Sequence, residues 1–179
     1  SVYYQWFEMI GEMNANNIRV YTLMHPTFYR ALKRYNEANP EKKLWLLQEI
    51  WPEEHPEDNN YLKEEYINNF NKEIEYTIDA IHGNLILPER KGRAYGDYYV
   101  DVSDYILGFL VGREFEPEEV VATNKLNNIT SYKGDYFEVK KGSPTEVWLA
   151  ESCDYLMKYQ VEKYNWQHPV SIVSWPTLD

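Results

Sequence analysis

Residues 105–117 have the sequence Tyr-Ile-Leu-Gly-Phe-Leu-Val-Gly-Arg-Glu-Phe-Glu-Pro, a nearly continuous apolar run that ends abruptly in polar residues and a proline. Such a run is typical of a strand that is buried on both faces of a parallel sheet. Proline cannot continue a central strand, but it suits the first position of a following helix. The stretch therefore predicts a strand near 105–112 that delivers polar side chains to the sheet edge where α/β proteins bind ligands.

The same pattern recurs along the chain, which predicts an alternation of strands and helices. The other apolar runs predict strands near 17–23, 44–50 and 169–174, and apolar stripes of helical period predict helices near 3–14, 27–38, 61–82 and 144–164. The last helix begins with a capping-box pattern, from Ser143 to Glu146, and should bury Cys153. This order favours right-handed βαβ units and therefore an α/β fold with a parallel sheet.

Length and composition indicate a globular domain that binds no nucleic acid. The chain has 179 residues, of which 44% are apolar, and its net charge is -11. We expect a single domain over residues 1–179, because this length can bury one substantial core. No clustered basic face is visible for a phosphate backbone, no apolar run reaches the length of a membrane span, and the opening residues do not resemble a signal peptide.

No pattern predicts a metal or a cofactor. The four histidines lack the spacing of metal ligands, and a single cysteine makes a structural zinc site improbable. A glycine-rich phosphate loop and a serine nucleophile elbow are both absent. The sequence leaves the cellular location open, with an extracellular or cell-surface setting as one candidate.

Aromatic residues and strand ends point toward a carbohydrate. The chain contains 17 Tyr and 6 Trp, and these side chains offer flat apolar faces that match the faces of sugar rings, although many of them lie at core positions of the helical stripes. The residues at or just beyond the C-terminal ends of the predicted strands form a candidate site: His25, Gln48, Glu49, Trp51, Arg113, Glu114, Glu116, Trp175 and Asp179. Single members also have structural interpretations, since Glu116 could precede a helix that starts at Pro117 and His25 could be a turn residue.

Two of these strand ends resemble a known superfamily. Asn17-Ile18-Arg19 on one strand, followed two strands later by residues 110–114 (Leu-Val-Gly-Arg-Glu), is similar to the retaining glycoside hydrolases with a (β/α)8 barrel of TIM type, such as β-galactosidases, β-glucuronidases and endoglucanases. The resemblance implies that the strands are the second to the fifth of the barrel. It also implies that Glu114 is the general acid/base and that Arg19 is a supporting arginine.

The sequence departs from this superfamily at two points. Arg113 stands where the superfamily usually has an asparagine that contacts the sugar 2-hydroxyl, and no glutamate of a seventh strand is present to act as the nucleophile. Retaining hydrolysis needs two carboxyl groups roughly 5–5.5 Å apart, although an inverting pair of Glu49 with Glu114 or Glu116 at roughly 6.5–9.5 Å stays open. The chain is therefore interpreted as a partial barrel of about four β/α units, with insertions near 83–104 and 124–142.

Two hypotheses follow from the resemblance. The chain is either part of a glycoside hydrolase or transglycosylase whose nucleophile lies elsewhere, or a carbohydrate-binding or assembly domain on the same barrel. In both cases Glu114 should lie in a cleft with Glu49 and Trp51 or Trp175, and burial should raise its pKa. Because an open sheet has unpaired edges, we expect a homodimer or the remainder of a longer chain as partner, and little glycosidase activity in isolation.

Overall fold

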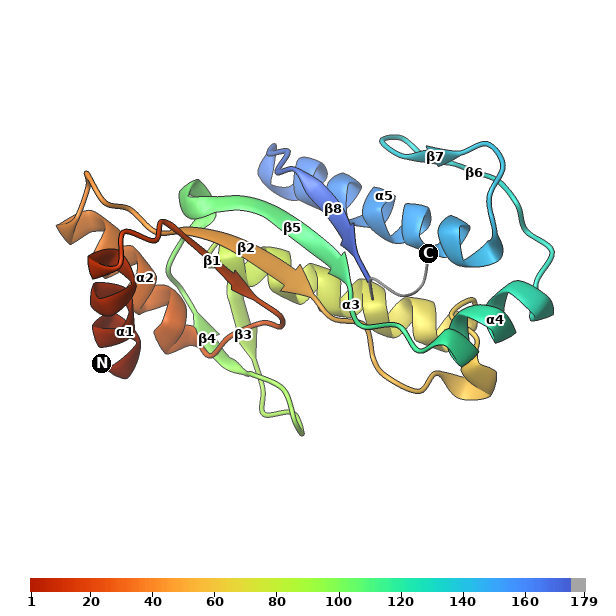
Figure 1. Ribbon diagram of the computed structural model, residues 1–179, viewed down its shortest axis with the longest axis horizontal. Coiled ribbons are helices and arrows are strands. Elements are labelled where there is room, and N and C mark those ends of the chain that lie inside the picture. Colours follow the sequence, from red (N-terminus) through yellow and green to blue (C-terminus); the bar gives the residue numbers. More distant parts are fainter. Residues whose placement is uncertain (175–179) are drawn as a thin grey trace. The chain divides into compact units, whose positions relative to one another are not determined.

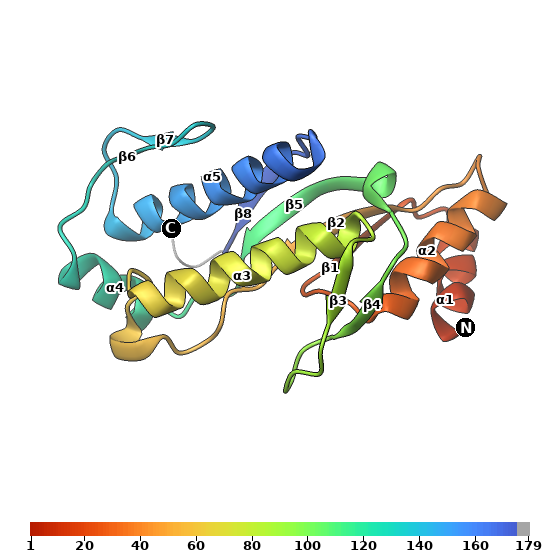
Figure 2. The same ribbon diagram turned by 180° about the vertical axis from the view of Figure 1, so that it is seen from behind.

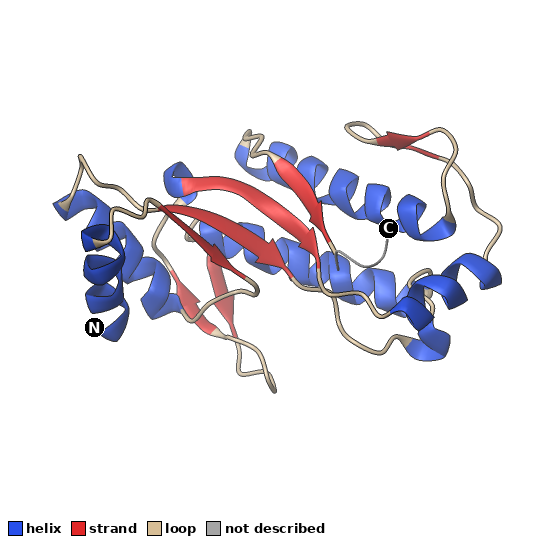
Figure 3. Cartoon of the chain, in the orientation of Figure 1, coloured by secondary structure: helices blue, strands red, loops and turns tan. Residues whose placement is uncertain are grey.

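The computed structural model describes residues 1–174 and has an α/β fold (Figures 1 and 3). Four strands form a parallel sheet in the order β1-β2-β5-β8, which confirms the predicted strand order. Their bounds are Asn17–Val20 for β1, Trp45–Ile50 for β2, Ile106–Gly112 for β5 and Val170–Val173 for β8. The buried pattern of β2 and β5 fits strands that are covered on both faces.

The contacts between residues divide the chain into two compact units. The first unit comprises Ser1–Glu49 and Tyr76–Phe109, and the second comprises Ile50–Glu75 and the described residues from Leu110 onward. Helix α3 (Glu64–Ile81) contributes to both units. The sequence predicts an apolar stripe of Ile67, Phe70, Ile74, Ile78 and Ile81 on this helix, and all of them are buried except Ile67, which is half-buried.

The first unit holds two packed helices and a hairpin. Helix α1 (Val2–Glu12) packs against α2 (Pro26–Ala38), and α2 also contacts strand β4 (Gly96–Tyr98) of the antiparallel hairpin that β4 forms with β3 (Leu85–Leu87) (Figure 2). A short 3₁₀ helix, η2, at Ser103–Tyr105 then leads into β5. Residues 85–98 of the segment 83–104 therefore form an antiparallel hairpin.

The second unit is built on helices α4 (Pro117–Leu126) and α5 (Pro144–Tyr164), which contact each other. It also contains the 3₁₀ helix η1 (Glu57–Asn59) and the antiparallel strands β6 (Tyr132–Lys133) and β7 (Glu138–Val139). The capping box of α5 is confirmed, since Ser143 Oγ accepts from the Glu146 amide and the Glu146 carboxylate accepts from the Ser143 amide. Cys153 is buried, as predicted.

Gly112 is required where strand β5 ends. Its φ is +130°, a conformation that side-chain-bearing residues rarely adopt, and an added Cβ would lie 2.3 Å from the carbonyl oxygen of Val173 on β8. The glycine therefore lets the chain turn at the end of β5, two residues before Glu114.

Several predicted boundaries were wrong by one to three residues. Strand β1 ends at Val20 and not near residue 23, helix α3 begins at Glu64 and not at 61, and α1 ends at Glu12 and not near residue 14. The predicted element order lacks helix α4. Its start at Pro117 agrees with the alternative interpretation of Glu116 as the residue that precedes a helix. None of the helices described over residues 1–174 is long and apolar enough to cross a membrane.

Asp154 fixes the strands β6 and β7 to helix α5. Its buried carboxylate accepts hydrogen bonds from the Tyr136 and Phe137 amides at 2.7 and 3.0 Å and from the Tyr132 hydroxyl at 2.9 Å. Burial alone would raise the pKa of Asp154, but these hydrogen bonds outweigh it and the net pKa is lowered.

We expect the stability supplied by Asp154 to depend on pH. Because the folded pKa is depressed, the contribution is complete above the unfolded value of about 3.9 and is lost as the pH falls through the folded pKa. Asp154→Asn should therefore cost about 1–3 kcal/mol at neutral pH and less at acidic pH. Urea denaturation of both proteins from pH 7 to pH 3 measures this difference, and a cost that does not change with pH would contradict it.

Candidate functional site

The polar residues at the ends of β1 and β2 form a connected cluster within the first unit. Glu49 is 1% exposed, and its Oε2 accepts hydrogen bonds from Arg19 Nε at 2.9 Å and Arg19 Nη2 at 2.7 Å. The Arg19 guanidinium also lies over the Tyr21 ring, 5.1 Å from its centre. Arg19 and Glu49, which the sequence placed on neighbouring strands, are therefore brought together as an ion pair.

Gln48 precedes Glu49 and is fully buried. Its side-chain oxygen accepts a hydrogen bond from the Tyr29 hydroxyl at 2.7 Å, and its nitrogen donates to the carbonyl oxygens of Thr22 and Glu49. The Tyr29 hydroxyl in turn accepts from the Met24 amide. Gln48 thus ties helix α2 and the segment after β1 to the end of β2, which is a structural role.

His25 is the N-cap residue of α2, and its ring is exposed. Nδ1 accepts a hydrogen bond from the Thr27 amide and lies 2.8 Å from the Thr27 hydroxyl. This geometry fits best the alternative interpretation of His25 as a turn residue whose ring already has hydrogen-bond partners.

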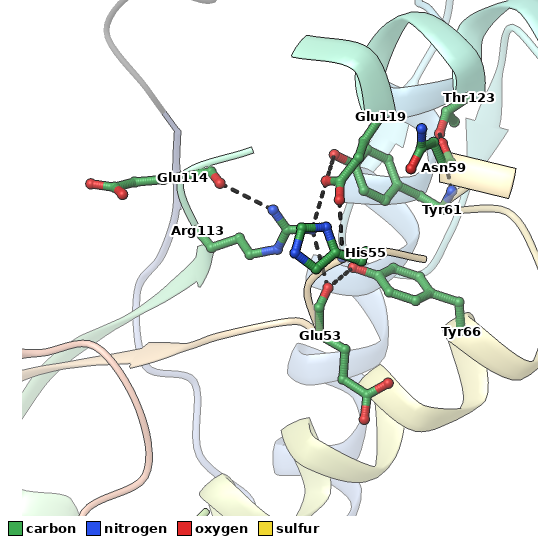
Figure 4. Close-up of polar contacts among 9 residues, drawn as sticks. All are labelled: Glu53, His55, Asn59, Tyr61, Tyr66, Arg113, Glu114, Glu119 and Thr123. Atoms are coloured by element: carbon green, nitrogen blue, oxygen red, sulfur yellow. Dashed lines mark hydrogen bonds and ion pairs between the residues drawn. The ribbon is translucent and has the colours of Figure 1, made fainter. Parts of the chain in front are cut away.

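In the second unit, Arg113 lies at the centre of a buried polar cluster (Figure 4). Its side chain is 1% exposed, and Nη2 contacts Glu119 Oε2 at 2.6 Å and donates to the Glu53 carbonyl at 3.1 Å. Nη1 donates to the carbonyl oxygen of Glu114 at 3.0 Å, and Nε has no acceptor among the described residues. Arg113 is therefore directed into the protein, which leaves it unable to contact a ligand at the surface.

Glu119 on α4 completes this cluster and was not foreseen from the sequence. It is 2% exposed and accepts hydrogen bonds from the Tyr61 hydroxyl at 2.8 Å and the His55 amide at 3.1 Å, in addition to its ion pair with Arg113. Burial and the bond to Glu119 raise the pKa of Tyr61. For Arg113, burial lowers the pKa, but the nearby Tyr66 and Glu119 outweigh it and the net pKa is raised.

Glu114 projects in the opposite direction. Its side chain is exposed and points away from the Arg113 cluster, while its backbone carbonyl is held by Arg113 (Figure 4). The carboxylate makes no hydrogen bond or ion pair with any residue in 1–174. The expectation that Glu114 is buried against aromatic side chains is wrong, because the extended chain beyond Gly112 turns Arg113 and Phe115 inward and Glu114 outward.

The remaining candidates follow strands in the same way. Trp51 is half-buried in the second unit, directly after β2. Glu116 is the N-cap residue of α4, but its exposed side chain makes no capping hydrogen bond. Trp175 and Asp179 lie outside the described residues.

The chemistry of these groups is that of carboxylates and aromatic rings. Within residues 1–174 no three His, Cys, Asp or Glu side chains are grouped as metal ligands. Glu49 is already engaged by Arg19, whereas the carboxylate of Glu114 is open to a ligand. No protein-family model, curated protein or solved structure matches the chain.

Proposed function

We propose that this chain is a partial (β/α)8 barrel of the glycoside hydrolase type that binds or acts on a carbohydrate, with Glu114 as its general acid/base. The observation that carries the proposal is the environment of Glu114. Its carboxylate is exposed and without a partner among the described residues, two residues beyond a buried parallel strand, while Arg113 holds its carbonyl oxygen. Ligands of α/β proteins bind at this end of parallel strands.

Glu114 would donate a proton to the leaving oxygen of a glycosidic bond and later remove one from the incoming hydroxyl. A second carboxylate is needed as nucleophile or base, and the proposal assigns it to a residue outside this chain. Glu49 is poorly suited to transfer protons, because Arg19 already donates two hydrogen bonds to it. Trp51, Trp175 and Glu116 remain candidates for contacts with the sugar, whereas His25 caps helix α2.

A second candidate function is a carbohydrate-binding domain without catalysis. Arg113 favours it, because the superfamily residue at this position contacts the sugar 2-hydroxyl, whereas the Arg113 side chain is buried and bonded to Glu119. An exposed Glu114 also lacks the apolar surroundings that keep a catalytic acid protonated near neutral pH.

Affinity electrophoresis through gels with dissolved polysaccharides, combined with assays on aryl glycosides, tests the proposal. We expect the wild-type chain to be retarded by at least one polysaccharide and Glu114→Gln to reduce that retardation. Glu118→Gln is the matched control, since Glu118 is an exposed glutamate in the first turn of α4. In a chain that includes the second carboxylate, Glu114→Gln should lower turnover by a factor of about 10²–10⁴.

Two results would contradict the proposal. One is the absence of retardation in every polysaccharide. The other is binding or hydrolysis that Glu114→Gln leaves as intact as Glu118→Gln does.

A further inference from the structure

A groove of about 430 Å³ opens on the second unit, and Trp51, Glu114 and Glu116 are not among its lining residues. Its walls come from the part of α3 that belongs to the second unit, where Ile67 and Asn71 line it, from α5 and from strand β6. The volume lies within the range of roughly 300–1,000 Å³ that small-molecule sites occupy. The lining includes Tyr132, Trp148, Glu151, Tyr155 and Tyr159.

The tyrosine rings of this groove are fixed through their hydroxyl groups. Tyr132 donates to Asp154 at 2.9 Å, Tyr155 donates to Glu75, and the Tyr159 hydroxyl accepts from Lys163 at 2.9 Å. A ring that is already held in place loses little conformational entropy when a ligand stacks on it. These three side chains therefore offer preorganised apolar faces.

Two polar groups of the groove lack a partner among the described residues. Trp148 is 1% exposed, and its indole nitrogen Nε1 is a buried donor without an acceptor. Glu151 is half-buried and makes no hydrogen bond or ion pair with residues 1–174, and burial raises its pKa. The indole nitrogen is closed to solvent, so Glu151 is the group that offers an unoccupied acceptor to a ligand in the groove.

This combination selects the class of ligand. The groove carries the carboxylates of Glu151, Asp154 and Glu162 and the ammonium group of Lys158, so an anion is repelled by the carboxylates and a cation by Lys158, and a neutral ligand meets neither repulsion. A sugar hydroxyl donates a hydrogen bond to an acceptor such as the Glu151 carboxylate, while the apolar face of the pyranose ring stacks on aromatic rings.

We propose that the groove between α3 and α5 is a binding site for a neutral pyranose sugar, with Tyr159 as a stacking platform and Glu151 as a hydroxyl acceptor. The site is separate from Glu114 and does not depend on the function proposed above. In a chain with both sites, the groove would bind a polysaccharide without reacting with it, while the reaction would take place at Glu114.

Isothermal titration calorimetry with four methyl pyranosides, those of glucose, galactose, mannose and N-acetylglucosamine, tests the proposal, with choline chloride as a cationic comparator. We expect at least one methyl pyranoside to bind. Tyr159→Ala should weaken that binding about tenfold, whereas Tyr164→Ala should leave it unchanged. The control is matched because both tyrosines lie on α5 and both rings contact Lys163, but Tyr164 does not line the groove.

Two further variants separate the alternatives. Glu151→Gln keeps an acceptor oxygen and should weaken sugar binding only severalfold, whereas it would abolish binding of a cation. Glu114→Gln should leave this binding unchanged, so a failure here is distinguishable from a failure of the function proposed above. Binding of choline alone, no binding of any methyl pyranoside, or equal affinities of Tyr159→Ala and Tyr164→Ala would overturn the proposal. Circular dichroism checks that each variant is folded.

Discussion

Glu119→Ala is expected to destabilise the protein by about 3–5 kcal/mol. The substitution leaves the Arg113 guanidinium, which is 1% exposed, without its carboxylate partner. It also removes the acceptor of the Tyr61 hydroxyl and of the His55 amide. Breaking one side of a buried ion pair is costly, because the remaining charge stays in a medium that solvates it poorly. Urea denaturation at neutral pH measures the change.

The neighbouring residue provides the control for this prediction. Glu118 has the same side chain in the same helical turn but is exposed, so Glu118→Ala should change the stability by no more than about 0.5 kcal/mol. The double variant with Arg113→Met and Glu119→Leu removes both charges and should be more stable than Glu119→Ala alone. Equal effects of Glu118→Ala and Glu119→Ala would show that the Arg113 cluster does not stabilise the fold.

Trp148→Ala should cost about 3–5 kcal/mol for a different reason, the loss of aromatic packing. Trp148 is 1% exposed, stacks on Tyr61 with 4.6 Å between ring centres, and meets the Phe115 ring at 5.7 Å. Alanine would leave a cavity that these neighbours could fill only in part.

Trp6→Ala is the comparison for this second prediction. Trp6 on α1 is 52% exposed, so its removal leaves no buried cavity. Trp6→Ala should therefore lower the free energy of unfolding much less than Trp148→Ala does. Thermal denaturation of the two variants gives the comparison. A melting temperature of Trp148→Ala that equals that of Trp6→Ala would contradict the assignment of Trp148 to the core.

The order of strands and helices could be predicted because it depends on apolar periodicity. Helix α5 shows this most clearly, since the predicted range 144–164 equals the observed Pro144–Tyr164. Its start is set by the capping box and its end by Asn165 in the left-handed conformation. The end of β1 could not be predicted, because it is set by the pairing of β1 with β2. This pairing stops at Val20, which lies opposite Gln48.

The candidate site was harder to predict than the fold. The apolar run alone does not tell which side of an extended segment each polar residue takes. A signal was present, however, because Phe115 lies between Glu114 and Glu116, and period-two alternation turns Arg113 inward with Phe115. The partner of Arg113 could not be found in this way, since the contact with Glu119 depends on the turn between β5 and α4.

The most direct test of the proposed function is an NMR titration of the ¹⁵N-labelled chain with the oligosaccharide of a polysaccharide that retards it. We predict that the amide signals of Glu114, Phe115 and Glu116 shift and saturate, and that Glu114→Gln weakens the fitted affinity while Glu118→Gln does not. Shifts confined to the groove of Tyr159, or no shifts at any concentration, would contradict the proposal that a carbohydrate binds at Glu114.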